Sequence, residues 1–185
     1  MSLALRRLTA LGTTAVLGAL MLATAPTATA ADRGSDFVCD PIYYRIKAAN
    51  RPMFNELAMT VALSPGNHGS VIQYQWEDES NQKWKLCRKR QSNGSEQVVF
   101  RDAWRRWCMA VNPNGNLWDW LVTVGCDDDY VPDEQKFTLV NVPNTNYTAI
   151  QGVRSGKWLA ANDFDTNGSQ ISLHNSPDLW VLEMA

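Results

Sequence analysis

The chain has 185 residues, of which 45% are hydrophobic, and its formal net charge is −2. This small negative charge gives no support for a nucleic-acid partner or for binding to an anionic membrane surface. The length is enough for one domain with a hydrophobic core and too short for two well-packed domains.

Residues 1–30 are predicted to be a secretory signal peptide and residues 31–185 a single mature domain. Arg6 and Arg7 give a positive start, the stretch 8–25 is apolar, and Ala-Thr-Ala at the end supplies a small-residue cleavage site. Gly, Thr and Pro residues interrupt the apolar stretch, which argues against a membrane anchor. We therefore expect a chain that has no membrane span, is secreted to the extracellular space, and carries a net charge of −4 once both arginines are removed.

The mature sequence divides into three similar blocks of short strands, at about 43–86, 98–139 and 147–182. Each block is expected to contain an opening strand, a second strand, a turn rich in Gly, Pro, Asn and Asp, a third strand, and a closing strand marked by an aromatic residue. The first three strands are expected at 44–46, 57–61 and 71–76 in the first block, 98–100, 107–111 and 121–126 in the second, and 147–150, 158–161 and 171–174 in the third. No convincing helical periodicity follows the signal peptide, so the fold class is predicted to be all-β.

A polar residue two positions before a large aromatic marks the end of each block. The three segments are Asn81-Gln82-Lys83-Trp84, Glu134-Gln135-Lys136-Phe137 and Pro177-Asp178-Leu179-Trp180. Their aromatics recur after 53 and then 43 residues, a period typical of arrays and pseudo-symmetric closed folds. The pattern resembles the Gln-x-Trp (QxW) repeat of ricin-B-type β-trefoil lectins, and it softens to Gln-x-Phe in the second block and to Asp-x-Trp in the third.

The resemblance implies a β-trefoil, in which three pseudo-symmetric repeats close on themselves and remove the sheet edges that an open array would expose. It covers residues 43–184, nearly the whole mature chain. Trp84, Phe137 and Trp180 are then expected to lie in the core, where burial of about 150–250 Å² for each ring contributes roughly 4–6 kcal/mol.

In ricin-type lectins, an Asp on the second strand holds sugar hydroxyls, an aromatic on the third strand stacks on the sugar, and an Asn before Gln-x-Trp adds a hydrogen bond. In repeat order, the Asp corresponds here to Thr60, Ala110 and Ala160, the aromatic to Tyr74, Val124 and His174, and the Asn to Asn81, Glu134 and Pro177. The carboxylate is missing from every repeat. Its loss predicts eroded sugar sites, because a charge-assisted hydrogen bond contributes about 1.5–3 kcal/mol.

The resemblance makes the first repeat the best-preserved carbohydrate-binding site, and the second repeat keeps no residue useful for sugar. The residues of the first repeat are Tyr74, Asn81 and Gln82, with Thr60 as a substitute acceptor. The third repeat keeps His174. The turn residues Asn162, Asp163 and Asp165 of that repeat offer another way to reach a ligand.

Four cysteines in an exported chain predict two disulfides, and the sequence alone leaves three pairings open. The resemblance implies Cys108–Cys126 inside the second repeat and Cys39–Cys87 between the N-terminal strand and the end of the first repeat. Since no Cys/His cluster with metal-ligand spacing is present, we expect no metal site and no cofactor. The run of three aspartates at 127–129 is interpreted as a solvated acidic turn rather than a calcium site.

These features favour a secreted, non-catalytic, lectin-like module for a carbohydrate or glycoconjugate, since no motif pairs a nucleophile with a base. The alternative is a protein-binding β-trefoil, such as a protease inhibitor or a toxin-associated targeting subunit. The missing Asp residues favour that alternative, as do four tryptophans of the second repeat that suit an interface unless the barrel partly buries them. They are Trp104, Trp107, Trp118 and Trp120. The sequence leaves open the sugar, the partner, the host type and the oligomeric state.

Overall fold

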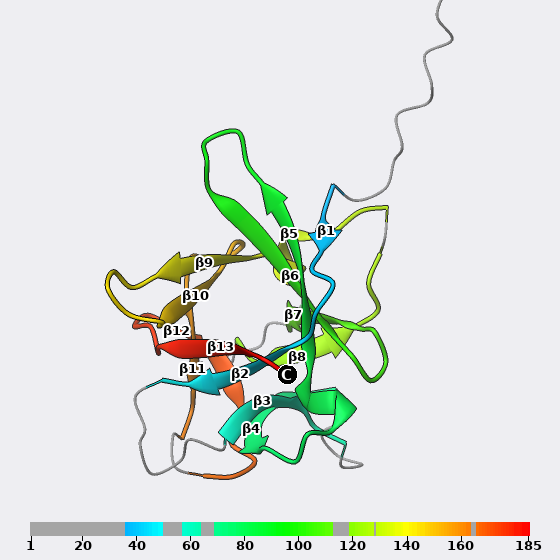
Figure 1. Cartoon of the computed structure of the whole chain (residues 1–185), viewed down its shortest axis with the longest axis vertical. Coiled ribbons are helices and arrows are strands. Elements are labelled where there is room, and N and C mark those ends of the chain that lie inside the picture. The colour runs from blue at the N-terminus through cyan, green and yellow to red at the C-terminus, as the bar shows by residue number, and fades with distance from the viewer. Residues whose placement is uncertain (1–35, 50–56, 64–68, 113–118, 128, 164–165) are drawn as a thin grey trace, which may run out of the picture. The chain divides into compact units, whose positions relative to one another are not determined.

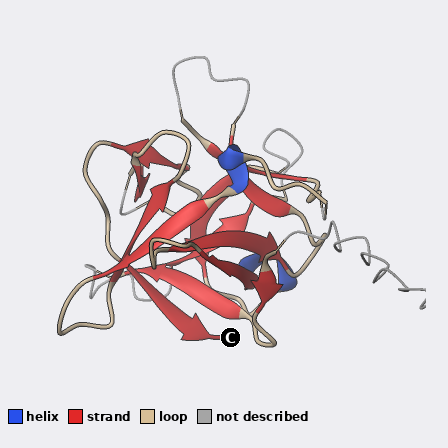
Figure 2. Cartoon of the chain, turned by 90° about the horizontal axis from the view of Figure 1, so that it is seen from above, coloured by secondary structure: helices blue, strands red, loops and turns tan. Residues whose placement is uncertain are grey.

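The structure is a computed structural model that describes residues 36–49, 57–63, 69–112, 119–127, 129–163 and 166–185. The predicted signal peptide lies outside this part of the chain. No helix among the described residues is long and apolar enough to cross a membrane. Figure 2 shows that these residues are strands and connecting loops, with two short 3-10 turns.

The described strands follow the predicted order of four in each repeat, after one additional N-terminal strand, β1 (Val38–Cys39). The first repeat contains β2 (Tyr44–Ala48), β3 (Leu57–Val61), β4 (Val71–Gln75) and β5 (Trp84–Arg90). The second contains β6 (Glu96–Asp102), β7 (Cys108–Val111), β8 (Leu121–Val124) and β9 (Phe137–Asn141). The third contains β10 (Thr148–Gly152), β11 (Trp158–Ala161), β12 (Ile171–His174) and β13 (Trp180–Met184). The 3-10 turns η1 (Ser80–Gln82) and η2 (Asp133–Gln135) precede β5 and β9.

The first and last strands of the three repeats close a six-stranded antiparallel barrel. Each strand pairs with the next in the order β2, β5, β6, β9, β10, β13 and back to β2. The last strand of the third repeat, β13 (red), therefore lies beside the first strand of the first repeat, β2 (blue), in Figure 1. Closure satisfies the backbone hydrogen bonds that an open sheet would leave at its edges.

The two middle strands of each repeat form a hairpin: β3–β4, β7–β8 and β11–β12. The three hairpins meet one another through single bridges, Ser70 to Val122, Ile72 to Gln170 and Trp120 to Ser172. One bridge between each pair of hairpins is the arrangement that threefold pseudo-symmetry requires. The predicted all-β β-trefoil is confirmed.

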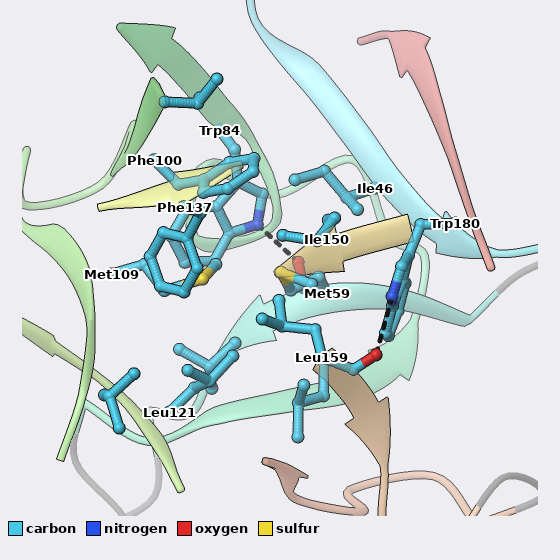
Figure 3. Close-up of a cluster of buried hydrophobic side chains, with 14 of the residues drawn as sticks. Ile46, Met59, Trp84, Phe100, Met109, Leu121, Phe137, Ile150, Leu159 and Trp180 are labelled. Atoms are coloured by element: carbon cyan, nitrogen blue, oxygen red, sulfur yellow. Dashed lines mark hydrogen bonds between the residues drawn. The ribbon is translucent and has the colours of Figure 1, made fainter. Parts of the chain in front are cut away.

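The aromatic residues that mark the closing strands are core residues, as predicted. Trp84 and Phe137 are fully buried and Trp180 is 1% exposed. The indole Nε1–H groups of both tryptophans donate to backbone oxygens of the second strand of their own repeats, Trp84 to Met59 (2.8 Å) and Trp180 to Leu159 (3.3 Å) (Figure 3). Each tryptophan therefore ties a barrel strand to a hairpin, and the buried polar group has a partner.

Both predicted disulfides are confirmed, Cys39–Cys87 and Cys108–Cys126. Cys39 stands opposite Cys87 in the pairing of β1 with β5. The two bridges pack together with Val99 and Val131 in a second, smaller apolar cluster. In the chain-entropy model, bridges of these loop lengths contribute about 3–4 kcal/mol each.

Two of the third strands end earlier than predicted. β4 ends at Gln75 rather than at residue 76, and β8 ends at Val124 rather than at residue 126. At Gln75 the cause is local, because its carbonyl accepts a hydrogen bond from the Gln82 side chain (2.6 Å) and its N–H donates to Asn167 Oδ1 (3.0 Å). These side chains take the place of strand partners and end the ladder.

Candidate carbohydrate-binding site

A hollow of about 310 Å³ in the first repeat brings together the four residues predicted there. It is lined by residues from β3, β4, η1 and the segments between them, namely Thr60, Val61, Ala62, Leu63, Ile72, Tyr74, Glu77, Glu79, Asn81 and Gln82. We name it the first-repeat pocket. It follows from the register of the hairpin, in which Ala58 pairs with Tyr74 and Thr60 with Ile72. Side chains at alternate positions of a strand share one face, and here that face is opposite to the buried Met59.

Gln82 forms the floor of the pocket and fixes the loop above it. The residue is 2% exposed. Its Nε2 donates to Gln75 O (2.6 Å), and its Oε1 accepts from the backbone N–H groups of Glu77 (2.7 Å) and Glu79 (3.4 Å). The Gln82 side chain thereby binds three backbone groups between β4 and η1, which explains why a polar residue precedes the buried aromatic at this position.

Thr60 and Asn81 also make internal hydrogen bonds. Thr60 is 3% exposed, donates its hydroxyl to Ala58 O (2.9 Å), and accepts from Gln82 Nε2 (3.3 Å). Asn81 is 8% exposed and donates from Nδ2 to Val61 O (2.9 Å), which ties η1 to β3. Both residues line the pocket, and their bonded geometry makes its walls rigid.

Tyr74 and Leu63 are the exposed apolar side chains of the pocket. Tyr74 is 37% exposed at the end of β4, and Leu63 is 49% exposed just after β3. A partly exposed ring on a hydrogen-bonded strand can stack on the C–H face of a sugar without first being ordered. Tyr74 thus has the position that the sequence predicted for the stacking aromatic.

Sequence reasoning missed Glu77 and Glu79, two exposed carboxylates in the lining of the pocket. The family pattern places the acceptor on the second strand, where this chain has Thr60, whereas the two glutamates lie in the loop after the third strand. The available signal was the acidic run Glu77-Asp78-Glu79, which begins three residues after Tyr74. The pocket therefore contains the carboxylates that its second strand lacks.

The third repeat has a hollow of about 400 Å³ at the equivalent position, which we name the third-repeat pocket. It is lined by Ala160, Ala161, Asn162, His174, Asn175, Ser176, Pro177 and Asp178. The pairing of Trp158 with His174 and of Ala160 with Ser172 repeats the register of the first hairpin. His174 is therefore in a pocket, as predicted.

The polar groups of the third-repeat pocket bind one another. Asn162 Oδ1 lies 2.9 Å from His174 Nε2 and accepts a hydrogen bond from the Ser172 hydroxyl, which also lies 2.9 Å from His174 Nε2. An amide oxygen can only accept, so Asn162 Oδ1 is the acceptor of the Ser172 hydroxyl. The three side chains thus form one polar network in the third repeat.

Asp163, which was predicted as a ligand contact, is not among the residues that line the third-repeat pocket. Its carboxylate accepts from the Thr166 hydroxyl, its N–H donates to Ser169 Oγ (2.8 Å), and its carbonyl accepts from Gln73 Nε2 (2.7 Å). These contacts organise the turn and join it to the first repeat. Asp165, the other acidic residue of this turn, lies outside the described residues.

The second repeat carries exposed tryptophans. Trp104, Trp107 and Trp120 are 36%, 37% and 39% exposed, and Trp118 lies outside the described residues. The Arg105 guanidinium lies 4.0 Å from the ring centre of Trp104 and 5.0 Å from that of Trp107. In the part of the chain that the structure describes, no group of three or more His, Cys, Asp or Glu residues could hold a metal ion.

No protein-family model matches this chain, and no curated protein sequence matches it significantly. Solved structures do match it. The designed threefold-symmetric protein ThreeFoil aligns with a TM-score of 0.61 at 18% identity, over 76% of this chain and 96% of that one. At identities this low, the likeness establishes the fold alone, which is that of the β-trefoil proteins.

Two natural proteins give similar alignments. The ricin B-like lectin of Macrolepiota procera, solved in complex with lactose, aligns with a TM-score of 0.57 at 16% identity, over 77% of this chain and 95% of the lectin. The cytolethal distending toxin of Haemophilus ducreyi aligns with a TM-score of 0.55 at 20% identity, over 76% of this chain and 81% of the toxin chain. The chain thus shares its β-trefoil fold with a ricin B-like lectin and with a toxin chain.

Proposed function

We propose that this protein is a secreted, non-catalytic carbohydrate-binding module and that the first-repeat pocket is its sugar site. The observation that carries the proposal is that one pocket is lined by the exposed ring of Tyr74, by the hydrogen-bonded Gln82 side chain and by two exposed carboxylates, Glu77 and Glu79. A sugar needs this combination, because the ring contacts its C–H face while oxygen acceptors bind its hydroxyls.

The ricin B-like lectin with bound lactose supports the proposal, since a protein of the same fold binds a sugar. The first-repeat pocket also has the volume of a site for a small ligand, about 310 Å³. The cysteine pairing agrees with export, because both disulfides require an oxidising compartment. The third-repeat pocket is the weaker candidate, since its polar groups already bind one another.

A glycan array tests the proposal. The purified wild type and the Tyr74→Ala variant are applied to identical arrays. We expect the wild type to bind a defined set of glycans and Tyr74→Ala to lose them while keeping the wild-type melting temperature. Tyr130→Ala is the matched control, because Tyr130 is 66% exposed and lines a different hollow. Silence of the wild type at high protein concentration would refute sugar binding.

One observation favours a second function, namely binding to a protein partner. Trp104 and Trp107 are partly exposed and both rings contact the Arg105 guanidinium, and Trp and Arg are among the residues most enriched in the hot spots of protein interfaces. The shared fold with a toxin chain agrees with such a role. Under this alternative, the glycan array is silent and the double variant Trp104→Ser, Trp107→Ser loses the partner without a change in melting temperature.

A further inference from the structure

The tripeptide Asn-Gly-Ser occurs twice in the sequence, at 93–95 and at 167–169. Both asparagines are exposed, and the two glycines have similar backbone conformations, with φ of 84° at Gly94 and 90° at Gly168. An asparagine followed by glycine deamidates readily, because no side chain shields the glycine nitrogen from the preceding amide carbon. Two identical tripeptides in one chain therefore isolate the effect of the fold on this reaction.

The contacts of Asn93 are confined to its own turn, which joins β5 to β6 in a hairpin that extends beyond the barrel in Figure 1. Asn93 Oδ1 accepts two hydrogen bonds from Ser95, one from the backbone N–H (3.0 Å) and one from the hydroxyl (2.7 Å). Gly94 N–H donates to Gln91 O (3.0 Å). Releasing the Gly94 nitrogen therefore costs one hydrogen bond of an exposed turn and leaves the barrel intact.

The contacts of Asn167 run to another repeat. Asn167 Oδ1 accepts the backbone N–H of Gln75 (3.0 Å), and Gly168 N–H donates to Gln73 O (2.8 Å). Gln73 and Gln75 both belong to β4 of the first repeat. The glycine nitrogen is released here only when the third-repeat turn separates from β4, so the fold protects this copy.

We propose that the turn at 93–95 is a self-modification site, at which Asn93 converts to aspartate and isoaspartate. The Gly94 nitrogen attacks Asn93 Cγ, and the new N–C bond closes a succinimide ring. The Cγ–Nδ2 bond breaks, and the amide nitrogen leaves as ammonia together with the proton of the glycine nitrogen. Water then opens the ring at either carbonyl, so each event adds one negative charge to the end of the hairpin.

Ser95 assists the attack on Asn93. Negative charge develops on Asn93 Oδ1 as the nitrogen adds to Cγ, and both Ser95 donors already point to that oxygen. Donors placed on a developing oxyanion stabilise the transition state. Ser169, the equivalent serine, instead donates its N–H to Thr166 O (3.1 Å), and its hydroxyl oxygen accepts from Asp163 N–H (2.8 Å).

Peptide mapping by mass spectrometry tests the inference on the purified, folded protein after several weeks at neutral pH. We expect the acid forms at Asn93 to accumulate at least about tenfold faster than those at Asn167, equivalent to about 1.4 kcal/mol in activation free energy. In concentrated urea the two sites should react at nearly equal rates, because the tripeptides are identical. Asn114-Gly115 lies outside the described residues and does not enter the comparison.

Ser95→Ala separates assistance by the serine from exposure alone. It removes the hydroxyl donor and keeps the N–H, so Asn93 should react several-fold more slowly in the folded protein and at an unchanged rate in urea. Ser92→Ala is the matched control and should keep the wild-type rate, since Ser92 is exposed in the same turn and supplies neither donor.

Equal rates at Asn93 and Asn167 in the folded protein overturn the inference. A rate in folded Ser95→Ala equal to that of the wild type also overturns it. Both results leave the proposed sugar site untouched, because neither tripeptide lines the first-repeat pocket.

Discussion

The first-repeat and third-repeat pockets lie at equivalent positions of the fold, yet they differ in the groups that they offer to a ligand. The paired positions of the two hairpins are Ala62 and Asn162, Ile72 and Ser172, and Tyr74 and His174, and all of these except Ser172 line the pocket of their repeat. In the first repeat these side chains are two apolar residues and an exposed ring. In the third repeat they form a network in which Asn162, Ser172 and His174 bind one another.

This difference separates two roles of the sequence. The trefoil backbone decides where a pocket lies, because the three hairpins have the same register and each precedes the closing strand of its own repeat. The side chains on one face of the hairpin decide whether the pocket is available to a ligand. Threefold symmetry of the fold therefore does not make three equal sites.

The largest expected effect concerns what the two pockets share. Trp84 and Trp180 each tie a closing strand to a hairpin, so Trp84→Ala and Trp180→Ala should each lower the free energy of unfolding by about 3–5 kcal/mol. Thermal unfolding followed by circular dichroism measures the loss. The exposed Tyr130 is the control, and Tyr130→Ala should change stability by less than about 0.5 kcal/mol, because Tyr130 is 66% exposed. If the melting temperature of either core variant fell by only a few degrees, the tryptophans would not stabilise the two hairpins as proposed.

A second prediction concerns the loop from β4 to β5, which the Gln82 side chain contacts at the first-repeat pocket. Gln82→Ala removes the bonds to Gln75 O and to the N–H groups of Glu77 and Glu79, and we expect a loss of about 2 kcal/mol in stability together with weaker sugar binding. Chemical denaturation and NMR titration measure the two effects. Unaltered affinity in a destabilised Gln82→Ala protein would show that the loop does not shape the site.

A third prediction compares the two pockets directly. Tyr74→Ala should weaken sugar binding by about tenfold or more, and His174→Ala should leave it unchanged, because His174 is engaged with Asn162. Isothermal titration with the tightest glycan from the array measures both. The reverse result, with His174→Ala as the damaging variant, would move the working site to the third repeat.

The smallest expected effect lies at the seam where the first and third repeats meet. Burial raises the pKa of Glu183, but hydrogen bonds and charges from Arg45 and Lys47 on β2 more than offset this and hold the pKa below its ordinary value of 4.5. A carboxyl whose pKa is depressed by folding stabilises the protein above the unfolded pKa, and this contribution is lost as the pH falls through the folded pKa.

Glu183→Gln should therefore lower stability by less than about 1 kcal/mol at pH 7 and flatten the dependence of stability on pH below about 4.5. Melting temperatures measured from pH 7 to pH 3 give both quantities. Sugar affinity should not change, since Glu183 lines neither pocket. An identical acid profile in the variant and the wild type would show that the seam contributes nothing.

Much of the fold could be predicted from the sequence because the repeated signals are local. In the first block the closing aromatic, Trp84, is buried, and the polar residue two positions before it, Gln82, holds the preceding turn. The cysteine pairs followed once the repeats were aligned. Strand ends were less predictable, since a side chain from the loop ends the ladder at Gln75.

The site was harder to predict because its residues had to be inferred position by position from the family pattern. Thr60 matched the position of the missing Asp, but its hydroxyl makes internal bonds that sequence does not reveal. Glu77 lies outside the pattern, so no alignment to the repeat would have selected it. Asp163 is acidic and in a turn, yet it serves the turn itself. Only the spatial arrangement distinguishes these cases.

The most direct test of the central claim is to locate a bound sugar by NMR on the isotopically labelled protein. If the first-repeat pocket is the working site, the backbone signals of Leu63, Tyr74 and Glu77 shift in a saturable manner while those of Asn162 and His174 stay in place. Saturable shifts confined to Asn162 and His174, or to the second repeat, would contradict the account.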